Sequence, residues 1–194
     1  PVFESLRREH GVTHFYFLDS HRSCLLRIHK PERRGDFIDR FTAREAERTG
    51  RIASGVELGV MGTLTLRVVH PVFENRTLIG YVELGKEIED IFQTRCIPGV
   101  EVAVVVDKAY LRRESWEEGM RLLERETDWD RMAHAVLAYS SQGRLPDAFV
   151  SWVERVDTEY AHEETGCEIV YADMTWRVSA MPLEDASGTE VGLL

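Results

Sequence analysis

Arginine, histidine and tyrosine side chains recur in strand-like runs of the first half of the chain, where they could line a binding site for a small polar molecule. Arg67 lies in one such run, and Arg27 and His29 lie in another. Alternate residues of a β-strand point to the same face, which places Leu25, Arg27 and His29 together. Because a guanidinium can hold a carboxylate through two parallel hydrogen bonds, Arg27 or Arg67 suits recognition of an organic acid or another anion.

Two further same-face pairs extend this set. His14 and Tyr16 alternate on an aromatic run, and Tyr81 alternates with Glu83 on a later one. Where a helix and loops cover a sheet, inward polar groups of this kind line the pocket. The predicted ligand-binding residues are His14, Tyr16, Arg27, His29, Arg67 and Tyr81.

A structural interpretation of the same residues stays open. The arginines would then pair with Glu57, Glu83 or Asp36 and brace the adjacent loop. The histidine and tyrosine side chains would be core or strand-surface groups. For Asp36 and Arg40, a helix cap and an ion pair are favoured over direct contact with a ligand.

Short strands and one helix must position these side chains. Residues 13–18 and 24–29 are β-rich and flank a polar turn, which predicts a hairpin. A basic loop containing proline then leads into a helix through Arg48, with Asp36 or Thr42 as its expected N-cap.

Three more strands follow, and then a second cycle of elements. The expected strands are residues 55–58, 63–70 and 78–84, followed by a helix over 86–92. This order predicts an α+β unit with a mainly antiparallel sheet, which is the element order of a PAS-like domain. The second cycle is expected to contain strands over 100–106, 133–139, 167–171, 175–181 and 190–194 and helices over 112–125 and 146–156.

The two cycles share a weak internal repeat. Arg67-Val68 is followed by Pro71 and later by Gly80, and Arg177-Val178 is followed by Pro182 and later by Gly192. The repeat predicts two tandem copies of one fold, each ending in a hairpin whose last strand carries a glycine.

Composition excludes several classes of protein. The 194 residues are 43% hydrophobic, which is enough for a real core. A net charge of −10 argues against a nucleic-acid partner, because phosphate binding requires a basic surface. No apolar stretch is long enough for a transmembrane helix, and no signal peptide is visible. Because the sequence starts at Pro1 without Met, we expect it to be part of a larger protein.

Signatures of catalysis and metal binding are missing from the sequence. The cysteines, Cys24, Cys96 and Cys167, are far apart and have no metal-ligand spacing. There is no H-E-x-x-H and no G-x-S-x-G motif, and the acidic pairs Glu117-Glu118 and Glu163-Glu164 lie in charged segments expected to face solvent. We therefore expect no enzyme activity, no metal site and no cofactor in this region.

Seven segments of the first half carry a resemblance to a known family: residues 13–17, 26–32, 35–42, 45–46, 55–59, 64–69 and 80–85. Over 100–194 the likeness rests on element order and on the ending from Pro182 to Gly192. Together these segments resemble the double Cache family, the tandem PAS-like extracytoplasmic sensor domains of bacterial histidine kinases, diguanylate cyclases and chemoreceptors.

The resemblance implies a periplasmic or extracellular domain of an inner-membrane receptor, anchored by flanking helices and dimeric in the full protein. It implies the end of an upstream helix (1–12), a membrane-distal PAS-like module (13–92), a linker (93–99) and a membrane-proximal module (100–194). We expect the sensor domain of a histidine kinase that binds a small metabolite in the distal module. The alternative is a structural or protein-interaction module of the same kind of receptor that binds no ligand.

Overall fold

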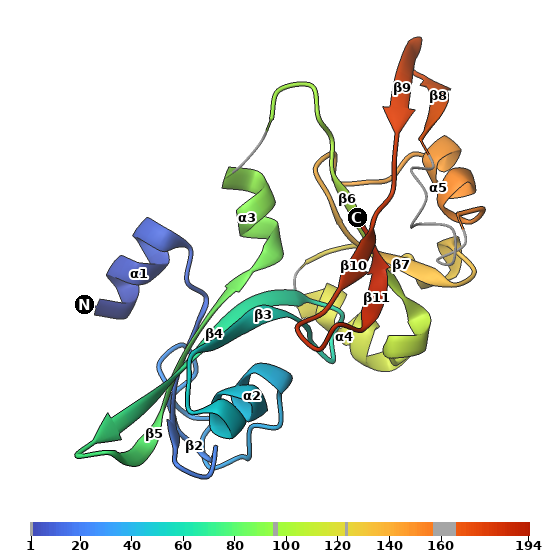
Figure 1. The fold of residues 1–194 in the computed structure, drawn as a ribbon. Helices are drawn as coiled ribbons and strands as arrows, with labels where there is room; N and C mark the ends of the chain where they lie inside the picture. Colours follow the sequence, from blue (N-terminus) through green and yellow to red (C-terminus); the bar gives the residue numbers. More distant parts are fainter. Residues whose placement is uncertain (1, 95–96, 123, 157–165) are drawn as a thin grey trace. The chain divides into compact units, whose positions relative to one another are not determined.

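The computed structural model describes residues 2–94, 97–122, 124–156 and 166–194 (Figure 1). Cys96 and Glu163-Glu164 lie outside these residues. The chain divides into two compact units. The first comprises Pro1–Glu57, Leu64–Thr94 and Asp185–Ser187, and the second comprises Leu58–Thr63, Arg95–Glu184 and Gly188–Leu194. Among the described residues, no helix is both long and apolar enough to cross a membrane.

The first unit is built on a five-stranded sheet in the order β2-β1-β5-β4-β3. Strand β1 pairs antiparallel with β2 and with β5, and β4 pairs antiparallel with β5, so the predicted first hairpin is confirmed. The elements are α1 (Val2–His10), β1 (His14–Asp19), β2 (Cys24–Arg27), α2 (Phe41–Thr49), β3 (Ala53–Leu58), β4 (Leu64–Glu74), β5 (Thr77–Glu87) and α3 (Ile88–Thr94).

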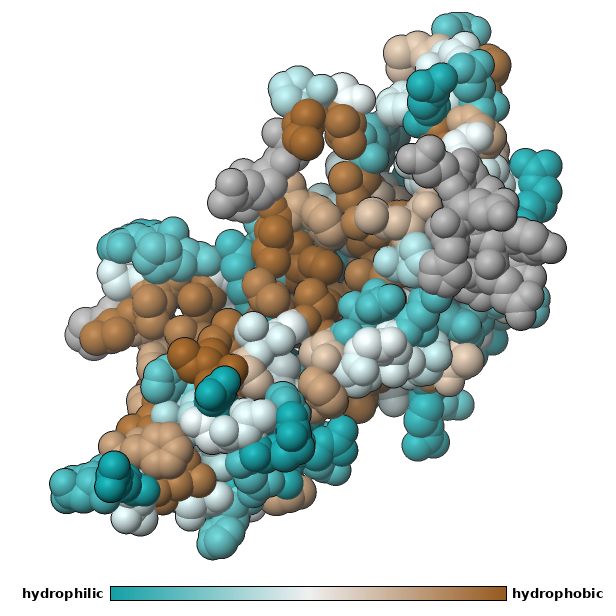
Figure 2. Space-filling view, viewed as in Figure 1, coloured by the Kyte–Doolittle hydropathy of each residue, from teal (hydrophilic) through white to brown (hydrophobic). Residues whose placement is uncertain are grey.

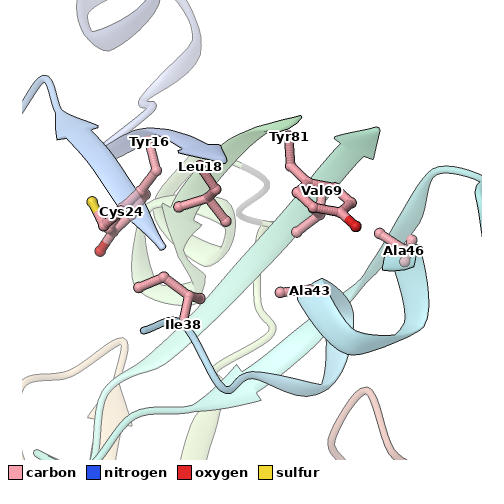
Figure 3. Close-up of a cluster of buried hydrophobic side chains, with 9 residues drawn as sticks. Tyr16, Leu18, Cys24, Ile38, Ala43, Ala46, Val69 and Tyr81 are labelled. Atoms are coloured by element: carbon pink, nitrogen blue, oxygen red, sulfur yellow. The ribbon is translucent and has the colours of Figure 1, made fainter. Parts of the chain in front are cut away.

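Helix α2 packs its small side chains against the sheet. Ala43 and Ala46 lie one turn apart on the same side of the helix and are fully buried, close to Val69 and Tyr81 of the sheet (Figure 3). The helix ends at Gly50, which adopts the left-handed conformation with φ of 63° and donates its N–H to Ala46 O. The other members of this hydrophobic cluster are Tyr16, Leu18, Cys24, Ile38 and Ala53.

A β-bulge in the first hairpin changes which residues point inward. The register pairs Phe17 with Leu26 but Leu18 with Cys24, so Leu25 is an extra residue on β2. The prediction that Leu25 shares a face with Arg27 was therefore wrong. Leu25 is 58% exposed, whereas Cys24 and Arg27 are buried.

The start of α2 also differs from the prediction. Arg40 is the N-cap residue and its side chain makes no capping hydrogen bond, so neither Asp36 nor Thr42 has the predicted role. The first turn is stabilised from the sheet instead, because the N–H of Thr42 donates to Glu57 Oε1 at 2.8 Å. A carboxylate from β3 thus performs the function expected of a local cap.

The second unit contains a four-stranded sheet in the order β10-β11-β6-β7 and a separate β8-β9 hairpin. The predicted strand over 175–181 ends at Val178, and the short β10 begins at Pro182. The elements are β6 (Ala103–Asp107), the 3-10 helix η1 (Lys108–Tyr110), α4 (Arg113–Leu122), the 3-10 helix η2 (Trp129–Arg131), β7 (Ala135–Ser140), α5 (Asp147–Val153), β8 (Cys167–Tyr171), β9 (Met174–Val178), β10 (Pro182–Glu184) and β11 (Glu190–Leu193).

The two sheets repeat one topology. The order β2-β1-β5-β4 in the first corresponds to β7-β6-β11-β10 in the second, as the internal repeat predicts. The glycines in the two last strands lie at matching places. A Cβ on Gly80 would meet Leu18 O of β1 at 2.2 Å, and a Cβ on Gly192 would meet Val105 O of β6 at 2.0 Å. The predicted fold class, α+β with two tandem PAS-like modules, is confirmed.

Candidate functional site

Four charged side chains form a cluster on the inner face of the first sheet, which we call the arginine–glutamate cluster: Arg40, Glu57, Arg67 and Glu83. Arg40 is partly exposed and the other three are buried. Arg67 Nη1 donates to Glu83 Oε1 at 2.8 Å, and Arg40 Nη2 donates to both oxygens of the same carboxylate at 2.5 and 2.6 Å. Glu57 Oε2 lies 3.3 Å from Arg67 Nε and 3.7 Å from Arg40 Nε. Three strands and the segment before α2 therefore meet through these charges.

The charges within the cluster balance, two positive against two negative. Glu83 is 0% exposed and Arg67 is 7% exposed, so each charge depends on its partner to offset the cost of leaving water. Burial alone would lower the pKa of Arg40, but the adjacent Glu83 carboxylate outweighs it and the pKa is raised. The pairing is incomplete, since the buried Nε atoms of Arg40 and Arg67 have no hydrogen-bond partner among the described residues.

His14, Tyr16 and His29 form a ring cluster beside these charges. The His29 ring centroid lies 4.7 Å from that of His14 and 4.9 Å from that of Tyr16 in edge-on contacts. The N–H of Phe15 donates to His29 Nδ1 at 3.2 Å. His29 Nε2 therefore carries the proton of the neutral ring and can donate a hydrogen bond.

Both imidazoles are held neutral. Burial, followed by the positive charge of Arg67, lowers the pKa of His14 to about 3. Burial also lowers the pKa of His29. At neutral pH the site therefore presents two uncharged rings. His29 can only donate, through Nε2, because its Nδ1 already accepts from Phe15, and His14 Nδ1 already shares a hydrogen bond with Thr13 Oγ1 at 2.9 Å, which leaves its Nε2 for a ligand.

Glu87 lies next to His14 and is held there by Thr65. Glu87 Oε1 lies 3.5 Å from His14 Nδ1, and Thr65 Oγ1 donates to the Glu87 carboxylate at 3.3 Å. Burial raises the pKa of Glu87. Gly85 is paired with both His14 and Arg67, and a Cβ there would lie 3.3 Å from Arg67 Nη1. The missing side chain leaves room for the guanidinium beside the imidazole.

Arg27 joins the sheet to the basic loop. Its Nη1 donates to Asp36 Oδ1 and to Arg33 O, both at 2.6 Å, and its Nη2 donates to the second oxygen of Asp36. This hydrogen-bonded guanidinium lowers the pKa of Asp36. The guanidinium also lies over the Tyr16 ring, with 5.2 Å between Cζ and the centroid. These contacts agree with the structural alternative given in the sequence analysis, in which Arg27 pairs with Asp36 and braces the loop.

Tyr81 lies in the hydrophobic cluster under α2. It is almost fully buried beside Leu18, and burial raises the pKa of its hydroxyl. The hydroxyl has no hydrogen-bond partner in the part of the chain that the structure describes. Of the six predicted residues, His14, Tyr16, Arg27, His29 and Arg67 thus form one connected group, whereas Tyr81 belongs to the core.

The sequence interpretation missed two members of this site, Glu87 and Thr65, and the ion-pair partner of a third, Arg40. Glu87 was assigned to a helix over 86–92, but β5 continues through it and turns it toward His14. Thr65 alternates with Arg67 on β4 and could have been found from that spacing. Arg40 was expected in an ion pair, but its partner Glu83 is distant in the sequence, and no local sequence pattern identifies it.

A family profile described as "Double sensory domain of two-component sensor kinase", dCache_3, matches residues 1–194. No curated protein sequence matches the chain.

The solved structures that are similar to this chain include three domains whose sequences have low identity to it. An extracellular ligand binding receptor from Desulfohalobium retbaense DSM5692 is 14% identical, with a TM-score of 0.46 over 99% of this chain and 31% of that one. A domain of a sensory box/GGDEF family protein from Vibrio parahaemolyticus is 15% identical, with a TM-score of 0.45 over 99% and 73%. The ligand binding domain of the Pseudomonas aeruginosa PAO1 amino acid chemoreceptor PctC, in complex with GABA, is 14% identical, with a TM-score of 0.37 over 94% and 72%. The chain thus spans under a third of the first of these proteins.

Proposed function

We propose a function for this chain from one premise: it belongs to the dCache_3 family, the double sensory domains of two-component sensor kinases. Its role is that of a sensory domain of a signalling receptor. The receptor that we propose is a histidine kinase, dimeric and anchored by flanking helices, with this domain in the periplasm or outside the cell. The proposed modules are residues 13–92, distal to the membrane, and 100–194, proximal to it, joined by a linker at 93–99.

The proposed ligand site is the polar group on the inner face of the first sheet. The observation that carries this proposal is the juxtaposition of two half-buried neutral imidazoles, His14 and His29, with the buried guanidinium of Arg67. Buried polar groups of a purely structural core are normally saturated with hydrogen bonds. Here Arg67 Nε makes no hydrogen bond among the described residues, although Glu57 Oε2 lies 3.3 Å from it, and His29 Nε2 can act as a second donor.

This set of donors favours a small ligand with acceptor oxygens, such as an organic acid or another anion. A carboxylate would accept from Arg67 Nε and from His29 Nε2, and a ligand hydroxyl or amide would accept from or donate to His14. Glu87 lies at the same edge, and its raised pKa allows it to become a donor more readily than an ordinary carboxyl. The proposed residues are His14, Tyr16, Arg27, His29, Arg67 and Tyr81, with Arg27 and Tyr81 acting through the shape of the site.

Signalling follows if the ligand binds two arrangements of the sheet and α2 with different affinities. The arginine–glutamate cluster ties β3, β4, β5 and the start of α2 together, so a ligand that competes for Arg67 would alter the contacts of all four. The difference in binding free energy then biases the transmembrane output.

The second candidate function is a structural or protein-interaction module that binds no small molecule. The observation that favours it is the ion pairing of Arg27 with Asp36 and of Arg67 with Glu83, which already occupies most of both guanidinium groups. The two functions differ in one measurable respect, which is stabilisation by a metabolite.

A thermal-shift screen of the 194-residue chain tests the proposal. The panel contains linear dicarboxylates, hydroxy acids, amino acids, amines and sugars. A ligand that binds only the native state stabilises it by about 2.7 kcal/mol at a concentration of about 100 times its Kd. We expect a saturable rise in Tm with at least one acid. No rise with any member of the panel would favour the module without a ligand.

Variants connect a positive result to the proposed site. Arg67→Ala would leave Glu57 without its nearest ion-pair partner and Glu83 with Arg40 alone, and could unfold the unit, so His29→Gln and Arg67→Lys are the informative changes. Each variant should bind the acid with an affinity at least tenfold lower than that of the wild type and should still unfold cooperatively. The matched control is His21→Gln, in an exposed turn. Unchanged affinity in His29→Gln and Arg67→Lys would contradict the assignment of the site.

A further inference from the structure

A cavity of about 370 Å³ lies inside the second unit, within the size range of small-molecule pockets. Helix α5 forms one wall, β6 and β11 form the floor, and the segment from β9 to Met181 forms the opposite wall. Figure 2 shows apolar side chains gathered along β6. The cavity is separate from the site proposed in the first unit, and neither proposal depends on the other.

Aromatic side chains make up much of the wall. Phe149 and Trp152 come from α5, and Trp176 comes from β9. The rings of Phe149 and Trp176 meet nearly perpendicularly, at 85° with 6.0 Å between their centroids. Val153 and Leu193 add aliphatic surface. Such a lining gains free energy from contact with a flat or branched apolar group.

The lining also contains polar residues, and two of them are cationic, Arg144 and Arg177; the others are Glu101, Ser140, Gln142 and Ser179. Arg144 lies at the edge of the cavity. In the part of the chain that the structure describes, its guanidinium pairs with Asp147 at 3.9 Å, and both side chains are highly exposed, so this contact compensates its charge weakly. The acidic member, Glu101, already accepts a hydrogen bond from Ser141 Oγ. The Nε1–H of Trp176 is buried and has no acceptor among the described residues.

We propose that this cavity binds a small carboxylic acid with an aromatic or branched apolar body. The apolar body would fill the space between α5 and β9, and the carboxylate would lie at the edge, where it accepts from Arg144. An acceptor oxygen that reaches Trp176 would satisfy the indole N–H, whereas an ammonium group offers no acceptor. The guanidinium groups of Arg144 and Arg177 and the indole N–H of Trp176 are all donors, and this selects an acid over an amine.

Calorimetric titration of the 194-residue chain with three probes of one shape tests the ligand class. The probes are 3-phenylpropionate, 3-phenylpropan-1-ol and 3-phenylpropylamine, each to about 10 mM, because weak small-molecule sites have Kd values near 1 mM. We expect the acid to bind at least tenfold more tightly than the alcohol and the amine. Absence of saturable binding by the acid, or equal binding by the amine, would overturn the proposal.

Two pairs of matched variants locate the binding. Val153→Phe fills the cavity from α5 and should abolish binding of 3-phenylpropionate, whereas Ala148→Phe, on the exposed side of the same helix, should leave it unchanged. Arg144→Gln should lower the affinity for the acid about tenfold and leave the affinity for the alcohol unchanged. Arg121 is exposed on α4, and Arg121→Gln should change neither affinity.

A third variant covers the case in which Val153→Phe does not fold. Ala180→Leu fills the same cavity from the opposite wall. Wild-type affinity in a folded cavity-filling variant would show that the acid binds elsewhere and would overturn the proposal.

Discussion

Arg67 and Glu83 form an ion pair shielded from water: Nη1 of Arg67 donates to Oε1 of Glu83 at 2.8 Å, and their side chains are 8% and 0% exposed. Arg40 holds the same carboxylate from the segment before α2. One carboxylate on β5 therefore connects the sheet to the start of the helix, and most of the candidate site is arranged around it.

Removing the charge of Glu83 should destabilise the first unit strongly. In Glu83→Gln, the guanidinium groups of Arg40 and Arg67 stay buried with one carboxylate between them, and breaking a buried pair in this way costs about 3–5 kcal/mol. Urea denaturation measures the loss. The control is Glu45→Gln, which breaks an ion pair with the largely exposed Arg48 and should cost less than about 1 kcal/mol. Equal losses in the two variants would contradict the structural importance of Glu83.

His14 should make stability depend on pH. Its pKa is about 3 in the folded chain and 6.5 in a model peptide, so below pH 6.5 the unfolded chain binds the extra proton and stability falls. At about pH 5 this loss is about 2 kcal/mol relative to neutral pH. The groups that face the ring are Arg67, His29, Arg40 and Glu87. The raised pKa of Glu87 acts in the opposite direction, because its neutral form is favoured on folding.

The comparison of His14→Gln with wild type isolates this contribution. Urea denaturation from about pH 7.5 to about pH 5 should show a smaller loss of stability in the variant, with a residual loss because the pKa of His29 is also lowered. His21→Gln, in an exposed turn, should retain the wild-type dependence. A dependence in His14→Gln as steep as that of wild type would show that His14 does not titrate as described.

Local patterns in the sequence predicted much of the fold. The polar turn between two β-rich runs gave the β1-β2 hairpin, and Gly50 ends α2 because the left-handed conformation suits glycine. The tandem architecture was visible in the spacing of Pro71 and Gly80 against Pro182 and Gly192, since each glycine lies where a neighbouring carbonyl leaves no room for a Cβ.

Contacts between distant segments could not be predicted in the same way. The bulge at Leu25 depends on how β2 pairs with β1, and the N–H of Thr42 is satisfied by Glu57, 15 residues away. Glu87 has a helix-forming neighbourhood, yet pairing with Thr65 keeps it in β5. The arginines were recognised as either ligand groups or structural ion pairs, and their ion-pair partners follow only from the folded sheet.

The glycines of the two last strands should be intolerant of substitution. In Gly80→Ala and Gly192→Ala the new methyl group would meet a backbone carbonyl oxygen at 2.2 and 2.0 Å, which requires a shift of the neighbouring strand. We expect losses of about 1–3 kcal/mol in thermal or urea denaturation. Gly166→Ala is the matched control, because its Cβ would have an ordinary 3.6 Å contact. Equal stability of all three variants would contradict the close strand approach at these positions.

The thiols of Cys24 and Cys167 should differ in reactivity. Cys24 is buried in the hydrophobic cluster under α2 and burial raises the pKa of its thiol, whereas Cys167 on β8 is half-buried. In a Cys96→Ser variant, Ellman's reagent should modify Cys167 readily in the native protein and Cys24 only after unfolding, because the thiolate is the reactive form and must be accessible. Equal rates for the two thiols in the native protein would contradict the burial of Cys24.

The central claim is that a small molecule binds beside His14 and His29, and the most direct measurement is nitrogen NMR of the imidazole rings. An acid from the thermal-shift panel is titrated into the 194-residue chain labelled with nitrogen-15 in histidine and tryptophan. We predict saturable shifts of the His14 and His29 ring nitrogens, with the His21 signals unchanged. If every stabilising acid leaves the His14 and His29 nitrogens unshifted, or shifts only the Trp152 and Trp176 indoles, the claim is contradicted.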